Sequence, residues 1–197
     1  MTTPPLRKPV AQDVIDLLLG RRSLSVAFLT DPGPTDAELE TILRIATRVP
    51  DHGKLAPWRI IVVRGKAQAR VGDEWARIFA ERTPDAPAEL VEFERRRPQR
   101  APLVLAVHTH IVNLEKIPRW EQQLAGANVC LNALIAANAL GYFSNWLTEW
   151  VAYDDEAKAA LGIPPEDDVL GYLYIGSGTT PTEERIRPAL GDVVREL

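Results

Sequence analysis

Two adjacent arginines and a serine follow the first amphipathic stretch of the chain, and their types suit the binding of an anion. The apolar spacing of residues 12–21 predicts a helix, and Arg21, Arg22 and Ser23 lie at its carboxyl end. Guanidinium groups can hold a phosphate bidentately, and a serine hydroxyl can donate a further hydrogen bond. The alternative is that the arginines only balance the negative end of the helix dipole.

The densest group of polar side chains lies between residues 48 and 58. This loop holds Arg48, Asp51, His52 and a lysine, together with two prolines and one glycine. Trp58 directly follows a proline, which indicates that the loop folds firmly against the rest of the protein. Loops of this kind carry binding residues in many proteins, and the alternative is a solvated connector.

The histidines raise the question of a metal site. His108 and His110 alternate along the end of a predicted strand, so both face one side, where Asp51 and His52 could complete a set of ligands. No HExxH or CxxC spacing accompanies them. We therefore favour satisfied or exposed histidines and predict no metal site.

No side chain is assigned as a catalytic acid, base or nucleophile, because the sequence lacks a nucleophile elbow, a P-loop and a Ser-His-Asp order. Cys130 is expected in the core. Gly176-Ser177-Gly178 has no helix pattern after it, which a dinucleotide fingerprint requires. The charged run from Glu92 to Arg97 is expected to be a solvated face. If the protein is an enzyme, its chemistry therefore comes from a bound cofactor.

The elements that must position these residues combine helices with short apolar strands. A capping box from Thr35 to Glu38 opens a helix that Pro50 ends, and the polar, proline-broken residues 83–100 indicate a helical excursion or lid. The strand order cannot be read from the sequence, but the mixture predicts an α+β protein, a three-layer α/β/α sandwich. The predicted strands are 58–63, 103–107, 143–147 and 169–175, and the other predicted helices are 67–81, 118–141 and 154–161.

The predicted helix at 118–141 has one stripe of large apolar residues and small residues on its other faces. The stripe consists of Leu124, Leu131, Leu134 and Ile135, whereas alanine and glycine dominate elsewhere. A helix that is apolar or small nearly all round is buried on several sides. It is either the central helix of a monomer or a helix shared with a partner chain.

Composition limits the class of protein. The 197 residues, 46% of them hydrophobic, suit one domain, and we expect a single domain over 1–197. A net charge of −4 argues against binding to nucleic acid or to an anionic membrane surface. One cysteine permits no internal disulfide, and the amino-terminal segment shows no secretory signal. We therefore expect a cytoplasmic protein that does not span a membrane.

Several segments, taken in order, resemble the nitroreductase family of FMN flavoproteins, and in particular its short bacterial members. The resemblance runs from the first helix to the last strand and rests on the joint order of the segments. In addition to residues 21–23 and 46–58, the segments are Arg100-Ala101-Pro102-Leu103-Val104, Pro118-Arg119-Trp120-Glu121-Gln122-Gln123, Trp146-Leu147-Thr148 and residues 169–176.

The resemblance implies a homodimer of the α+β class with FMN at the subunit interface. It places Arg21, Arg22 and Ser23 at the phosphate and pyrimidine side of the flavin. A basic residue near the carboxyl terminus adds to the phosphate site in many members of the family. Arg187 is the candidate for that residue in this chain, with Arg185 as its rival.

The resemblance also assigns residues to the flavin ring. It places Trp146, Leu147 and Thr148 along the ring, where Trp146 or another tryptophan, Trp58, walls the pocket. Arg48 and His52 would reach the flavin from the other subunit. The end of the central helix, residues 136–141, is associated with the nicotinamide nucleotide.

The activity implied by the resemblance is hydride transfer from NAD(P)H through flavin N5 to a small nitroaromatic or quinone-type acceptor, in a ping-pong sequence. Many members have a basic residue where this chain has Ser25, so support for the reduced flavin would have to come from Arg48. The rivals are a specialised flavoenzyme of the same fold with a non-nitro substrate, and a flavin-binding or assembly protein that transfers no hydride.

Overall fold

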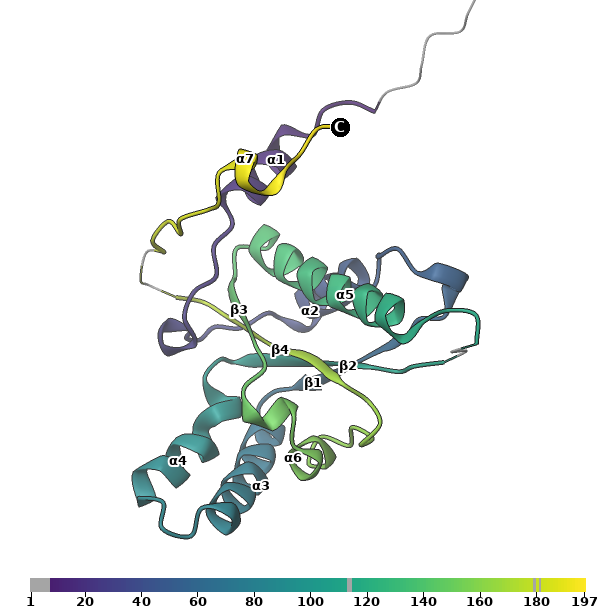
Figure 1. The fold of residues 1–197 in the computed structure, drawn as a ribbon. Coiled ribbons are helices and arrows are strands. Elements are labelled where there is room, and N and C mark those ends of the chain that lie inside the picture. Colours follow the sequence, from purple (N-terminus) through teal and green to yellow (C-terminus); the bar gives the residue numbers. More distant parts are fainter. Residues whose placement is uncertain (1–7, 113–114, 179, 181) are drawn as a thin grey trace, which may run out of the picture.

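The computed structural model describes residues 8–112, 115–178, 180 and 182–197, and its centre is an antiparallel sheet (Figure 1). Within the described residues, the sheet has four strands in the order β1-β2-β4-β3. Each strand begins at its predicted residue and ends within two residues of the predicted end. The strands are β1 (Trp58–Val63), β2 (Leu103–Thr109), β3 (Phe143–Leu147) and β4 (Val169–Gly176).

Strand β2 forms the centre of the hydrophobic core. All of its residues are buried, because helices cover both of its faces and strands pair with both of its edges. Val104 lies opposite Val63 of β1, and Leu103 lies opposite Ile175 of β4. A continuous apolar run, rather than an alternating one, is what a strand buried on both faces needs.

Two helices, α2 (Asp36–Ala46) and α5 (Arg119–Ala139), cover one face of the sheet (Figure 1). The predicted capping box opens α2. The Thr35 backbone N–H donates to the Glu38 carboxylate at 2.8 Å, and the Glu38 N–H donates to the Thr35 hydroxyl at 3.3 Å. These bonds satisfy backbone donors that the first turn of a helix leaves free.

Helix α5 packs on the sheet through its small residues. Ala125 and Gly126 are buried, and Gly126 lies so close to Leu170 of β4 that an added Cβ would collide with the leucine side chain. Pro118 is the N-cap of the helix, and Gly141, with φ of 88°, follows its carboxyl end as predicted. The glycine is required there because other residues rarely adopt this conformation.

The predicted apolar stripe of α5 does not form the buried face as a unit. Leu134 is buried and Ile135 is half-buried, but Leu124 and Leu131 are 54% and 40% exposed. Close approach to the sheet requires small side chains on the packed face, which leaves these two leucines outside the core of a single chain, as the alternative of a helix shared with a partner chain allows. Cys130 is wholly buried, as expected, and burial raises the pKa of its thiol to about 12.

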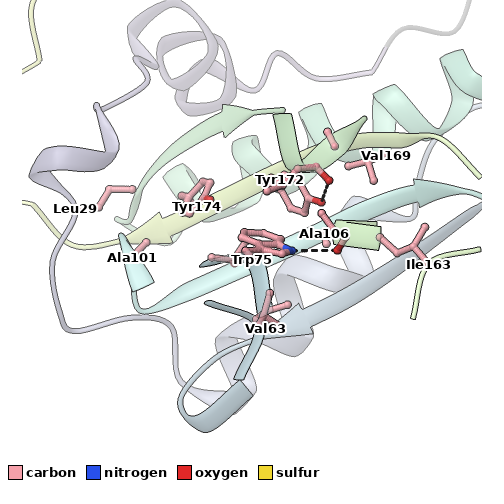
Figure 2. Packing of buried hydrophobic residues seen from close by; sticks show 14 of the residues in the cluster. Leu29, Val63, Trp75, Ala101, Ala106, Ile163, Val169, Tyr172 and Tyr174 are labelled. Atoms are coloured by element: carbon pink, nitrogen blue, oxygen red, sulfur yellow. Dashed lines mark hydrogen bonds between the residues drawn. The ribbon is translucent and has the colours of Figure 1, made fainter. Parts of the chain in front are cut away.

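Three further helices cover the opposite face, which completes the predicted three layers. They are α3 (Lys66–Arg82), α4 (Ala88–Arg96) and α6 (Asp155–Ala159). Trp75 of α3 packs edge-on against Tyr172 of β4 at a centroid distance of 5.6 Å (Figure 2). Its indole N–H donates to the Ala157 carbonyl at 3.0 Å, so the ring is buried without an unsatisfied donor.

Residues 83–100 contain α4 and a short 3-10 helix, η3 (Arg97–Gln99), so the predicted helical excursion is present. The expectation that residues 92–97 form a solvated face is wrong for Glu94 and Arg97. Each is 5% exposed, and the two side chains form an ion pair. Residues three apart share one helix face, so both charges turn inward and neutralise each other there.

The helices at the two chain ends, α1 (Gln12–Gly20) and α7 (Leu190–Val193), project from the sandwich on the same side (Figure 1). An ion pair between Arg22 and Glu184 joins the two end segments. Helices this short are marginal in water unless their apolar face is covered. The exposed apolar residues of the ends include Val10, Val14, Ile15, Leu18, Leu19, Leu190, Val193 and Val194.

No helix within the described ranges has both the length and the apolar composition needed to cross a membrane.

The contact between α3 and α4 leads to a first prediction. Gly72 lies so close to the Arg95 carbonyl oxygen that a Cβ would overlap it. Alanine is the better helix former by about 1 kcal/mol, yet we expect Gly72→Ala to lower the free energy of unfolding by about 1–3 kcal/mol, because α4 must shift. Urea unfolding measures this change. Gly20→Ala is the control, because a Cβ at Gly20 meets nothing within 4 Å. A Gly72→Ala protein as stable as the parent would contradict the close contact between Gly72 and the Arg95 carbonyl oxygen.

Candidate functional site

A small cavity brings together the two ends of the chain. One wall comes from the residues that follow α1, and the other from the segment that precedes α7. The cavity has a volume of about 130 Å³ and is lined by Arg21, Arg22, Ser23, Glu183, Arg185 and Arg187. The structure thus places Arg21, Arg22 and Ser23, which were expected at a phosphate, next to both basic candidates from the carboxyl-terminal segment, Arg185 and Arg187.

The lining of this arginine cavity has a strong excess of positive charge. It includes four guanidinium groups and one carboxylate, that of Glu183. Glu184, outside the lining, pairs with Arg22 and lies 3.9 Å from Arg187. Guanidinium groups at such short range repel one another, and a bound anion offsets that repulsion and forms charge-assisted hydrogen bonds.

Arg21 and Arg22 differ in what their side chains already bind. Nη1 of Arg22 donates to the Leu19 carbonyl at 3.0 Å and to the Arg21 carbonyl at 2.7 Å. Nη1 of Arg21 is buried and has no hydrogen-bond partner in the described part of the chain. Leaving a buried donor unsatisfied costs about 1–3 kcal/mol, and more for a charged group. Arg21 is therefore the arginine with a buried donor available to a bound acceptor.

A larger hollow, of about 430 Å³, adjoins the arginine cavity and shares Ser23 and Glu183 with it. Its wall combines hydroxyl groups with the apolar side chains of Leu24 and Phe28, a lining that suits a flat organic group. Ser25 also lines it and caps a short helix, η1 (Val26–Phe28), by accepting from the Ala27 N–H at 3.4 Å. Among the described residues, no lysine or arginine lines this hollow.

The loop from Arg48 to His52 is attached to α5 at two places, the first turn of the helix and Asn132. Nδ1 of His52 lies 2.7 Å from a carboxylate oxygen of Glu121, in the first turn of that helix. The Asn132 amide donates to the Arg48 carbonyl at 3.1 Å, while the Arg48 side chain is exposed. The loop is therefore fixed to the protein, as the position of Trp58 indicated.

Within one chain, the structure does not bring His52 to the arginine cavity. The cavity segment is tied to the carboxyl end of α5, where the Leu24 N–H donates to the Ser144 carbonyl at 3.2 Å and the Asn138 amide donates to the Ser144 hydroxyl at 3.0 Å. The stretch of helix from Glu121 to Asn138 is roughly 25 Å long at 1.5 Å per residue. His52 and the arginine cavity thus lie at opposite ends of one rigid element, whereas Arg48 is bonded to Asn132 in the second half of the helix.

The three residues expected along the flavin ring lie at the end of β3. Trp146 lies over Gly171, where a Cβ would collide with the indole, and its indole N–H donates to a β4 carbonyl at 2.9 Å. Leu147 packs in the core on the other side of the sheet. Thr148 accepts a hydrogen bond from the Tyr153 hydroxyl at 3.2 Å. Because strand side chains alternate between faces, all three residues can face one ligand only through their backbone.

Two of the three histidines, His52 and His108, have separate polar partners. His52 pairs with Glu121, whereas Nδ1 of the buried His108 lies 2.8 Å from the Thr109 carbonyl and 3.1 Å from the Asp167 carboxylate. No group of three potential metal-ligating side chains occurs within the described ranges. His108 is therefore a buried histidine whose Nδ1 has polar partners.

One polar cluster next to Thr148 was missed in the sequence. Arg97 and Arg100 both form ion pairs with Glu149, the residue after Thr148. Arg100 and Glu149 are 49 positions apart, so no helix or strand periodicity connects them. The sequence signal for this cluster was the high density of arginines before β2. Such a density is equally typical of a surface exposed to solvent.

Taken together, the antiparallel sheet between two helical layers and the arginine cavity at the joined chain ends are features of an α+β protein of the nitroreductase type. The chain belongs to this family: the sequence model described as the Nitroreductase family matches residues 18–177.

Curated relatives carry matching names. "Putative NAD(P)H nitroreductase YdjA" of Escherichia coli K12 is 31% identical over 167 residues, which cover 84% of this chain and 88% of that protein. A Haemophilus influenzae protein with the same designation, but without the gene name, is 30% identical over 177 residues, covering 89% of this chain and 94% of its own length.

Solved structures confirm the fold. The nitroreductase-like protein of Bacillus cereus superposes with a TM-score of 0.79 at 20% identity, covering 100% of this chain and 98% of its own. A nitroreductase of Bacteroides fragilis with bound FMN has a TM-score of 0.67 at 18% identity, covering 94% and 98%. At these identities the likeness establishes the α+β architecture predicted from the sequence.

The difference between the two adjacent arginines generates the second prediction. In ligand-free protein, Arg21→Met removes a buried unsatisfied donor, so we expect the free energy of unfolding to stay equal or rise by about 1–3 kcal/mol. Arg22→Met loses an ion pair and two hydrogen bonds and should lower it. Urea unfolding with and without inorganic phosphate measures both effects. Stabilisation by phosphate should disappear in Arg21→Met, and equal destabilisation by the two substitutions would contradict the assignment.

Proposed function

We propose that this protein is an FMN-dependent NAD(P)H oxidoreductase that passes a hydride equivalent to a nitroaromatic or quinone-type acceptor. The observation that carries the proposal is the arginine cavity with its buried, unsatisfied Arg21 nitrogen, located where the family resemblance expects the flavin phosphate. Family membership and the NAD(P)H nitroreductase names of the relatives support the electron donor. The FMN named in the Bacteroides fragilis structure supports the cofactor.

The cavity residues fit a phosphate monoester. Arg21 would donate its free Nη1–H, and the exposed Ser23 hydroxyl would donate a second hydrogen bond. Arg22, held by backbone carbonyls and Glu184, keeps its charge nearby without changing its position. Each charge-assisted hydrogen bond contributes about 1.5–3 kcal/mol. Arg185 and Arg187 add charge from the carboxyl-terminal segment and close the cavity.

The adjoining hollow would receive the ring, because Leu24 and Phe28 offer apolar surface there. The chemistry that bound FMN supplies is acceptance of a hydride equivalent from NAD(P)H and its later transfer to the acceptor. The protein side chains bind and orient the reactants, and none is required as an acid or base. Since Ser25 contributes no charge, a cation beside the ring would come from Arg48 of a second copy.

The site is completed, in this proposal, by a homodimer. Neither Arg48 nor His52 lines the arginine cavity of its own chain, and Trp120 and Leu124, which lie beside His52, are 59% and 54% exposed. His52, Trp120 and Leu124 line a shallow hollow of about 290 Å³. Apolar surface on α5 and on both chain ends is typical of an interface rather than of a solvated monomer. A partner chain would cover these faces and bring its Arg48 and His52 to the flavin.

Absorbance spectroscopy tests the proposed function directly. The purified protein should show the two visible bands of an oxidised flavin, and these should bleach when NADH or NADPH is added without oxygen. A nitroaromatic or quinone added afterwards should restore them. A protein that binds FMN but does not bleach is a binding protein, and one that binds no flavin contradicts the proposal.

A charge on α5 tests the homodimer. Leu124→Glu would bury an unpaired carboxylate in the proposed interface, so we expect dissociation to monomers and loss of bound FMN. Sedimentation velocity and the ratio of flavin to protein absorbance measure both. Leu90→Glu, at a leucine of α4 that is 49% exposed, is the matched control and should change neither. A Leu124→Glu protein that stays a flavin-loaded dimer would place the interface elsewhere.

A further inference from the structure

Glu149 has a backbone conformation that is normally confined to glycine. Its φ is 59° and its ψ is 179°, and it connects the end of β3 to a short 3-10 helix, η4 (Trp150–Ala152). This region of backbone space is strained for any residue with a Cβ, and such residues persist only where the surroundings hold them. Residues of this kind cluster at binding and catalytic sites.

The side chain of Glu149 is held by two arginines. Arg97 and Arg100 both pair with its carboxylate, and Nη1 of Arg100 donates to Oε1 at 3.0 Å. Arg100 is itself fixed, because it donates to the Tyr174 hydroxyl at 3.0 Å and lies over the Tyr174 ring at 4.8 Å. Tyr174 is wholly buried in β4 (Figure 2), so the carboxylate is anchored to the sheet.

A second anchor runs to α4. Arg97 donates two hydrogen bonds of 2.6 Å to Glu94, and the indole N–H of Trp150 donates to the same carboxylate at 2.8 Å. Glu149 and Trp150 are therefore tied to one network by their side chains. The two carboxylates and two guanidiniums cancel in charge, so the network fixes the chain without adding net charge.

The carboxylate of Glu149 stays ionised in this setting. Burial by itself raises the pKa of the carboxyl, but the hydrogen bonds and charges of Arg100 and Arg97 outweigh it and hold the pKa below the usual value. Both arginine side chains are more than four-fifths buried, at 6% and 15% exposure. Such pairs are costly to break because a lone buried charge remains.

We infer that Glu149 is a positioning residue: its carboxylate, held by Arg97 and Arg100, keeps the chain in a glycine-like conformation and so fixes the backbone of residues 146–148 against the flavin. This inference rests on the proposed function for the identity of the ligand and for its position beside residues 146–148. A glycine at this position could adopt the same conformation but many others as well. A clamped glutamate permits one conformation, which keeps the backbone dipoles beside the cofactor in a constant direction.

A pair of substitutions separates backbone conformation from ion pairing. Glu149→Ala and Glu149→Gly remove the same two ion pairs, and Arg97 stays paired with Glu94 in both, but only glycine reaches the strained conformation without help. We expect Glu149→Ala to bind FMN at least tenfold more weakly than the parent and to shift its midpoint potential. Glu149→Gly should retain affinity and potential closer to those of the parent.

The readouts are the dissociation constant for FMN from fluorescence quenching, the midpoint potential from dye-linked redox titration, and urea stability. Glu92 on the surface of α4, paired with Arg96 at 2.6 Å, provides the control. There, Glu92→Gly should be less stable than Glu92→Ala, because glycine disfavours helix. At Glu149 the order should reverse, so that the glycine variant is more stable than the alanine variant.

Identical affinity, potential and stability in the alanine and glycine variants would overturn the inference and leave Glu149 as an ion-pair cross-link. A reversed stability order without any change in affinity or potential would overturn it too, since the conformation would then have no bearing on the cofactor. A parent protein that binds no FMN would contradict the proposed function, which the spectrum shows before any variant is made.

Discussion

The close packing of α5 on the sheet sets the positions of the other parts of the candidate site. Gly126 lets the helix approach β4, and alanines along the same face maintain that approach. The helix is thus a rigid element. The segment of the arginine cavity is bonded to its carboxyl end through Ser144, and His52 is bonded to its first turn through Glu121. Any shift of α5 moves both groups together.

This constraint also explains why two large residues of α5, Leu124 and Leu131, point outward. A helix that uses its small face against the sheet cannot also bury Leu124 and Leu131 there. Trp120 and Leu124 line a hollow next to His52 that one chain leaves uncovered, and Leu131 is exposed two turns further along the helix. The small residues of α5 allow close packing inside the subunit, and its large exposed residues provide apolar surface for a partner. Both properties follow from the same distribution of small and large residues around the helix.

Charge is distributed differently at the two ends of β3. Near its start, the arginine cavity has an excess of positive charge, and Arg21 keeps a buried donor without a described partner. Beyond its end, Glu149 and Arg97 belong to a buried network whose charges cancel. The first arrangement costs free energy unless an anion is bound, whereas the second is complete by itself. The first suits ligand binding and the second suits mechanical support.

The sequence alone determined the elements, because local patterns encode them: apolar runs at the strands, the capping box at Thr35 and the glycine after α5 all act within a few residues. It also determined the grouping of Arg21 with Ser23, which are neighbours in the chain. Strand order, the burial of Arg97 and the clamp on Glu149 were decided only by the tertiary structure. They depend on contacts between residues tens of positions apart, such as Arg100 and Glu149, and no local periodicity records such contacts.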